Sequence, residues 1–282
     1  LFGQDLNLCA YADINLAVHF NDRFEFAQAA EICRKWEKNP AYEFLTPENK
    51  GRILSSIGQT YAFAKDFINA EEYFTKACDI FTNKQNHISH EQYDHTLVYR
   101  ALNILDCKAF PVAKTVAEMV FKCSFDEAID RYASTIEMPF HHHLLVRNLY
   151  MNPDLSYLKE KYLSKQKSWV NVPQHPWELI ELYRSLMICI NDSQKARKRF
   201  ALLWELYSEI NGGSTLHLLE AYALTASKKI CGCEVQEEKF NNLLKRIKQN
   251  LPAASDICNE LQKTFAAPGR TMCWDILPFN YK

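Results

Sequence analysis

Residues 51–81 alternate small and aromatic side chains in a way that strongly constrains the fold. Leu54, Ile57, Gly58 and Tyr61 follow one another at the spacing of a single helix face. After a short break the same spacing returns in Phe67, Ala70, Phe74 and Ala77. Where two helices cross closely, one must lack bulk, and large side chains fill the space beside the crossing. The stretch therefore predicts a hairpin of two amphipathic helices, in which Gly58 and Ala70 permit the close approach.

This hairpin resembles a tetratricopeptide repeat, whose pattern of Leu, Gly, Tyr, Ala, Phe and Ala spans two helices in about 34 residues. The best match covers residues 51–82, and the proline expected at its end is replaced by Thr82. The matching positions are Leu54, Ile57, Gly58, Tyr61, Ala70, Phe74 and Ala77.

One hairpin cannot bury its apolar faces alone, so neighbouring hairpins are expected. Weaker matches to the repeat are found on both sides of residues 51–82. A shift of 41 residues towards the N-terminus aligns residues 10–41, through Leu16, Ala17, Phe20, Phe26 and Ala29. A shift of 43 residues the other way aligns residues 94–121, through Leu97, Ala101, Ile104, Phe110, Ala113 and Val120. The resemblance implies an all-α chain with helix-turn-helix repeats stacked into a right-handed superhelix.

We expect the repeats to occupy residues 1–121 and a more degenerate helical region to occupy residues 122–282. The pattern of the second region indicates either degenerate repeats or a capping helical bundle. A possible subdivision lies near residues 165–174, where helical periodicity is lost. Ser124 and Glu127 have the spacing of a capping box at the start of a helix. Several later helices are expected to begin at or near prolines.

Composition narrows the class of function. The net charge is −1, from 33 basic and 34 acidic residues, so no overall field draws the chain to nucleic acid or an acidic membrane. The ten cysteines are scattered through mostly apolar stretches, and neither a signal peptide nor a membrane span is apparent. We therefore expect a cytoplasmic protein. The first residue is Leu1 rather than Met, which suggests an excised or processed part of a longer protein.

Metal binding and catalysis are alternative functions for this sequence. His87 and His90 could share a metal with Asp94 or His95, which would make the chain a metal-dependent enzyme, but this spacing is common by chance. The two thiols of residues 231–233 favour a simple turn over a metal site, and the His141–His143 run favours a helix start with one buried and two exposed imidazoles. No nucleotide-binding, nucleophile or metalloprotease motif is present, so we expect no catalytic residue, no metal and no cofactor.

A second alternative is nucleic-acid binding by the basic patch Lys195, Arg197, Lys198 and Arg199, with Lys228, Lys229, Lys245, Arg246 and Lys248 as candidate neighbours. The patch opens an amphipathic helix, however, whose polar face must carry charge in any case. Nucleic acid is therefore the disfavoured partner.

The resemblance implies a concave groove lined by the first helix of each repeat. Carrying its positions over gives Tyr11, Ile14, Val18 and Asn21 in the first hairpin, Arg52, Ser55, Gln59, Ala62 and Phe63 in the second, and His95, Val98 and Leu102 in the third. Some relatives clamp a terminal carboxylate with lysine, but Ile14, Ser55 and Val98 hold that position here. We therefore predict a scaffold, adaptor or sensor module that binds a mixed-sequence peptide or amphipathic helix of another protein. The oligomeric state is left open.

Overall fold

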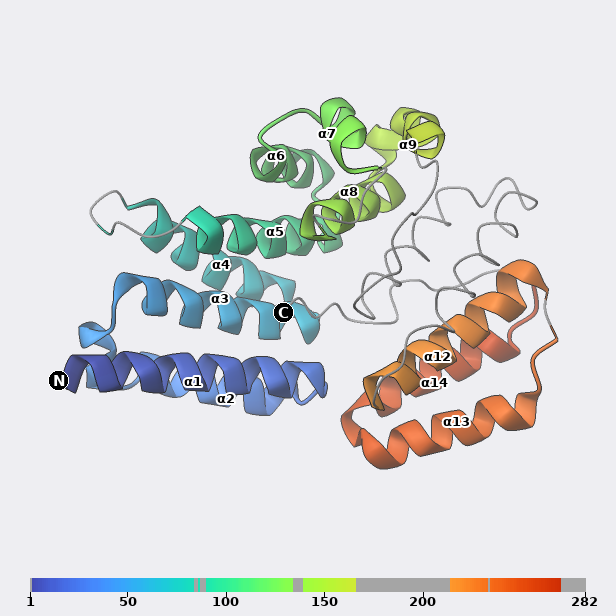
Figure 1. Ribbon diagram of the computed structural model, residues 1–282, viewed down its shortest axis with the longest axis horizontal. Coiled ribbons are helices and arrows are strands. Elements are labelled where there is room, and N and C mark those ends of the chain that lie inside the picture. Colours follow the sequence, from blue (N-terminus) through green and yellow to red (C-terminus); the bar gives the residue numbers. More distant parts are fainter. Residues whose placement is uncertain are drawn as a thin grey trace. The chain divides into compact units, whose positions relative to one another are not determined.

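The structure is a computed structural model that describes residues 2–83, 86, 90–133, 139–165, 214–232 and 234–269. In this part of the chain every regular element is helical (Figure 1). The chain divides into two compact units, residues 1–128 and 129–281, and the boundary falls within helix α7, Phe125–Tyr132. The expectation of an all-α chain is confirmed for the described residues.

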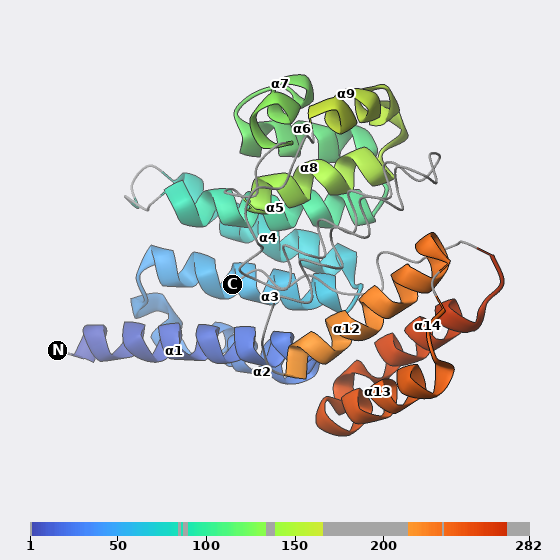
Figure 2. The same cartoon turned by 45° about the vertical axis from the view of Figure 1, so that its right-hand side comes forward.

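The first unit contains three successive helical hairpins. They are α1 with α2 (Phe2–Asp22, Phe26–Glu37), α3 with α4 (Pro47–Phe63, Phe67–Thr82), and α5 with α6 (His90–Asp106, Phe110–Phe121). Helix α3 contacts both α1 and α5, so the hairpins stack as layers (Figures 1 and 2). Helices α1, α3 and α5 thereby share one side of the stack.

The same turn joins the two helices of each hairpin. Phe24, Lys65 and Lys108 adopt left-handed conformations, with φ of 62°, 63° and 60°. The next residue donates its backbone N–H to a carbonyl five positions earlier: Glu25 to Phe20 (2.9 Å), Asp66 to Tyr61 (2.9 Å) and Ala109 to Ile104 (3.2 Å). This is the Schellman pattern that ends helices by satisfying free carbonyls. The turns recur at the offsets of 41 and 43 residues at which the sequence aligns with itself.

Close packing of α3 on α4 depends on glycine. A Cβ added to Gly58 would lie 2.8 Å from Cδ1 and Cε1 of Phe74, a ring that is fully buried. A Cβ added to Gly51 would lie 2.5 Å from the ring of Phe81. Ala70 is also fully buried. The small residues therefore make room for aromatic rings of the opposite helix, as the sequence pattern predicts.

The connection between the first two hairpins starts α3 in a fixed register. A short 3₁₀ helix, η1, covers Pro40–Phe44, and Thr46 then caps α3 by accepting a hydrogen bond from the N–H of Asn49 (3.3 Å). The amide of Asn49 in turn donates to the Asn7 side chain on α1 (2.8 Å). Proline at the first helical position suits this start, because the missing N–H would have no partner within the helix.

The predicted capping box is confirmed. The backbone N–H of Ser124 donates to Oε2 of Glu127 (3.0 Å), and the N–H of Glu127 donates to Oγ of Ser124 (3.3 Å). These two bonds satisfy free amides in the first turn of α7. The adjoining rings of Phe121 and Phe125 lie edge to face, 5.2 Å apart.

The second unit contains α8 (Pro139–Met151), the 3₁₀ helix η3 (Pro153–Leu158) and α9 (Lys159–Lys165). Both α8 and η3 begin at a proline, as expected. The expectation for the histidine run is wrong, because His142 and His143 are both buried and His141 is half-buried. His142 Nε2 lies 3.1 Å from the hydroxyl of Tyr162, so packing against α9 covers this side of α8.

Later in this unit, α12 (Ser214–Ala226) continues into a π-helical turn at Ser227–Cys231 and packs with α13 (Glu237–Asn250) and α14 (Ser255–Ala266). A 3₁₀ turn at Pro252–Ala254 leads into α14. The rings of Phe240 and Phe265 stack 4.0 Å apart between α13 and α14. The possible subdivision near residues 165–174 lies outside the described residues beyond Lys165.

Candidate protein-binding surface

Three of the predicted groove residues occupy aligned positions of α1, α3 and α5, namely Tyr11, Arg52 and His95. The guanidinium of Arg52 lies over the ring of Tyr11, 4.8 Å from its centroid. Arg52 also acts electrostatically on His95. Tyr11 is exposed, and the other two side chains are half-buried. The first two hairpins thus bring an aromatic and a cationic group into contact, and the third carries an imidazole at the aligned position, where the charge of Arg52 acts on it.

The electrostatic setting of His95 is mixed. Burial lowers the pKa of this histidine, and the neighbouring Arg52 lowers it further, whereas Glu91 and Asp94 act to raise it. Burial disfavours the charged imidazolium because the interior solvates it poorly. Asp94 is in turn paired with Lys122, with 3.2 Å between Nζ and Oδ2. From the sequence, Asp94 was expected only as a candidate metal ligand, and this ion pair was not foreseen because nothing in the local pattern links α5 to the end of α6.

The next predicted row lies inside the stack. Ile14, Ser55 and Val98 are all buried, with exposed fractions of 4%, 6% and 2%. Thr96 donates a hydrogen bond from its hydroxyl to Oγ of Ser55 (3.1 Å), which ties α5 to α3. These positions support the packing between hairpins.

The remaining predicted groove residues divide between the surface and the interior. Val18, Gln59, Ala62 and Phe63 are half-buried, whereas Asn21 and Leu102 are buried. Asn21 donates its amide to the hydroxyl of Thr60 (3.2 Å), linking α1 to α3. The ring of Phe63 lies 5.9 Å from that of Phe26, so this side chain also contributes to packing between the first two hairpins.

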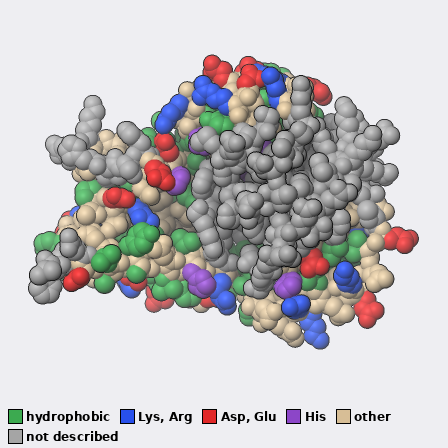
Figure 3. All heavy atoms as spheres, in the orientation of Figure 1, with side chains coloured by type: hydrophobic (Ala, Val, Ile, Leu, Met, Phe, Trp, Pro, Cys, Tyr) green, Lys and Arg blue, Asp and Glu red, His purple; other side chains and the backbone are tan. Residues whose placement is uncertain are grey.

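The accessible members of this set are therefore Tyr11, Val18, Arg52, Gln59, Ala62, Phe63 and His95, and we call them the groove face. Figure 3 shows hydrophobic, basic, acidic and histidine side chains interspersed on this side of the first unit. The mixture contrasts with the single-sign surface that steers a strongly charged ligand.

Most of the alternative sites fall outside the described residues. His87 and the basic patch Lys195, Arg197, Lys198 and Arg199 belong to undescribed segments, as does Cys233. Among the residues that the structure describes, no three His, Cys, Asp or Glu side chains are grouped so that they could hold a metal ion. The described residues therefore provide no structural support for the metal or nucleic-acid hypothesis.

Two candidate neighbours of the basic patch are engaged in helix packing. Lys229 is buried and its ammonium donates to the carbonyl oxygen of Ala267. The ammonium of Lys228 lies over the ring of Phe265, 3.7 Å from the centroid. Lys248 on α13 donates to Oδ1 of Asn259 (2.8 Å), and Lys245 and Arg246 are exposed. The two lysines that follow α12 therefore serve the contact with α14.

The cysteines of the first unit differ in exposure. Cys33 and Cys78 are buried, and burial raises the pKa of their thiols to about 12 and about 11. Cys9 and Cys107 are exposed, and Cys123 is half-buried. A buried thiol with a raised pKa is a poor nucleophile, because the reactive thiolate is scarce at neutral pH.

No helix among the described residues is both long enough and apolar enough to cross a membrane. No protein-family model, no curated protein and no solved structure matches this chain.

Proposed function

We propose that this chain is a repeat protein of the tetratricopeptide type that binds another protein through the groove face. The observation that carries the proposal is the stacking of Arg52 on Tyr11, which joins two successive hairpins through accessible side chains, while the Arg52 charge also acts on His95 at the aligned position of the third. The recurrence of one turn at offsets of 41 and 43 residues supports the reading of the hairpins as repeats. Stacked repeats of this kind form extended binding surfaces.

The chemistry of the groove face favours an amphipathic helix or a mixed-sequence peptide. Val18, Ala62 and Phe63 offer apolar contact, Gln59 offers hydrogen bonds, and Arg52 offers a single cation already stacked on Tyr11. A terminal carboxylate clamp would need several cations, and the positions that carry its lysines in relatives are the buried Ile14, Ser55 and Val98. Aromatic and arginine side chains commonly dominate the binding energy of protein interfaces. In the cell, such a module would act in the cytoplasm as an adaptor or as the sensing part of a larger chain.

Affinity capture with matched variants tests this proposal. Arg52→Glu combined with Gln59→Arg changes the groove face while sparing Phe63, whose contact with Phe26 makes its removal ambiguous. The control is Lys76→Glu, an exposed position on α4 at the opposite side of the hairpin. We expect a protein held by wild type and by Lys76→Glu to be lost from the groove variant, at unchanged helical content by circular dichroism. Equal capture by all three forms would refute the assigned face.

A further inference from the structure

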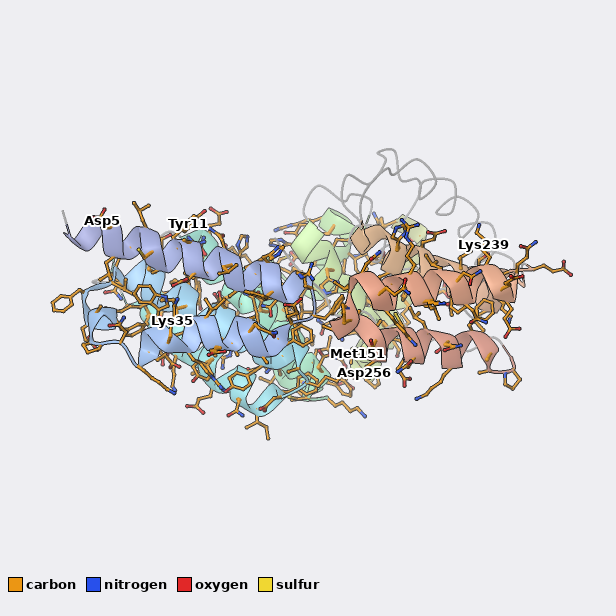
Figure 4. The ribbon with its side chains drawn as sticks, turned by 90° about the horizontal axis from the view of Figure 1, so that it is seen from below. Asp5, Tyr11, Lys35, Met151, Lys239 and Asp256 are labelled. Atoms are coloured by element: carbon orange, nitrogen blue, oxygen red, sulfur yellow. The ribbon has the colours of Figure 1, made fainter. Side chains whose placement is uncertain are left out.

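Helix α1 carries an exposed stripe that corresponds to a buried stripe of α3. The stripe runs along Leu8, Ala12 and Leu16, and the two leucines are 66% and 43% exposed. The residues 41 positions later are Asn49, Ile53 and Ile57, which are 8%, 0% and 0% exposed. Helix α3 is covered on this side by the first hairpin. Helix α1 presents the equivalent side at the end of the stack. Figure 4 shows this end, with α1 and α2 nearest the viewer.

The stripe is symmetric about Ala12. Leu8 and Leu16 lie four residues to either side of it, and Asp5 and His19 lie seven residues to either side. All of these side chains are exposed. At about 100° per residue, they fall within one stripe of the helix opposite its buried residues Ala10, Ile14 and Ala17. Along the stripe, an acidic side chain is followed by a leucine, a small alanine, a second leucine and an imidazole.

We propose that two copies of this chain associate through antiparallel α1 helices with Ala12 at the crossing point. In this arrangement Leu8 of one copy packs against Leu16 of the other, and Ala12 lies against Ala12. Asp5 then faces His19 of the second copy, whose ring N–H can donate to the carboxylate. A self-complementary patch of this kind is what a two-fold interface requires.

The spacing of the stripe also suits helix crossing. Leu8, Ala12 and Leu16 form a ridge of residues four apart, and ridges of this type interlock in the commonest class of helix packing. The small Ala12 at the centre allows the axes to approach, and the leucines on either side fill the space. This inference is independent of the proposed function, because it uses the outer stripe of α1 and none of the groove face.

The size of the stripe predicts a weak dimer. The stripe of residues 5–19 spans about 22 Å of helix, and this is the upper limit of the contact, because crossed helices diverge away from the crossing point. Two helices crossing over this length bury less surface than the standard interface of a stable complex. We therefore expect dissociation in the micromolar range.

Sedimentation velocity of the 282-residue chain tests the association. Between about 1 and about 200 µM, concentrations that bracket the expected affinity, the wild-type protein should pass from monomer to dimer. Leu8→Glu should weaken the dimer by at least about tenfold, because it buries a charge at the contact. The matched control is Ile68→Glu, since Ile68 on α4 is 84% exposed and lies off the stripe. A wild-type protein that stays monomeric throughout, or an equal effect of Ile68→Glu, would overturn the proposal.

Charge exchange and cross-linking test the antiparallel register. Asp5→Lys should weaken the dimer, and adding His19→Glu should restore it, because the exchanged charges face each other again across the two-fold axis. In a Cys9→Ser, Cys107→Ser background, Ala12→Cys should form an intermolecular disulfide under mild oxidation, since Cα atoms at a close helix crossing lie within disulfide reach. Ala27→Cys on the exposed side of α2 is the control. Failure of the charge exchange to restore association, or equal cross-linking at Ala27, would overturn the proposed geometry.

Discussion

Replacing Gly58 by alanine sets two opposing effects against each other. In the interior of an exposed helix, alanine is more favourable than glycine by about 0.5–1 kcal/mol, because the glycine backbone loses more freedom on folding. In α3, however, the new Cβ would lie 2.8 Å from two carbons of the Phe74 ring. Real Cβ atoms do not approach so closely, so the ring or the helix must move.

The packing effect should win. Phe74 is fully buried, and its ring also stacks near Tyr99 of α5, with centroids 6.4 Å apart, so it has little room to shift. Overpacking a core typically costs about 1–3 kcal/mol. After subtraction of the gain in helix propensity, we expect Gly58→Ala to lower the free energy of unfolding by about 1–2 kcal/mol.

A double-mutant cycle, followed by urea denaturation, measures the coupling energy between Gly58 and Phe74. In a Phe74→Leu background the ring is gone, so Gly58→Ala should become neutral or stabilising, and the coupling energy should be about 1–3 kcal/mol. The difference between Lys76→Ala and Lys76→Gly, at an exposed position of α4, gives the propensity effect alone. If Gly58→Ala stabilises wild-type protein, or costs the same with and without the Phe74 ring, the packing argument is wrong.

Three further outcomes are expected. Lys65→Gly should raise the free energy of unfolding by about 0.5–1 kcal/mol in urea, because φ of 63° strains any side chain, and Lys65→Ala should bring no such gain. The pKa of His95 is lowered in the folded chain, so the unfolded chain binds more protons as the pH falls through about 6.5; His95→Gln should therefore lose less stability than wild type between neutral pH and pH of about 5.5. Mass-spectrometric mapping after brief alkylation should find Cys9 and Cys107 modified well before the buried Cys33 and Cys78, and comparable labelling of all four in the native state would contradict their assigned burial.

Local features of the fold were accessible from sequence because they depend on residues close together in the chain. Helical periodicity predicted the hairpin of α3 and α4, and the capping box at Ser124 depends on a partner three residues away. The self-alignment at offsets of 41 and 43 residues located the turns at Phe24 and Lys108 relative to that at Lys65. Periodicity reports such features because helix geometry converts spacing in sequence directly into position on a face.

Tertiary packing decided which of the aligned groove positions reach the surface. Family positions carried over from a repeat assume one geometry of stacking, but Ser55 is covered through its hydrogen bond with Thr96, and Ile14 and Val98 lie between helices. Arg52 could be recognised as a polar residue on α3, but its stack on Tyr11 depends on how two hairpins meet. The burial of His142 likewise depends on tertiary packing, since its ring meets the hydroxyl of Tyr162 on α9.

The sequence by itself determined where helices begin, turn and pair, since hydrogen bonds and spacings within about one hairpin control these features. Only the tertiary structure distinguished α1 from α3. The two helices align residue by residue, yet among the described residues α3 has a hairpin on each side and α1 has one. The same stripe is therefore buried in α3 and exposed in α1. The physical reason is that burial is a property of the neighbours a surface meets, and neighbours distant in sequence leave no trace in local periodicity.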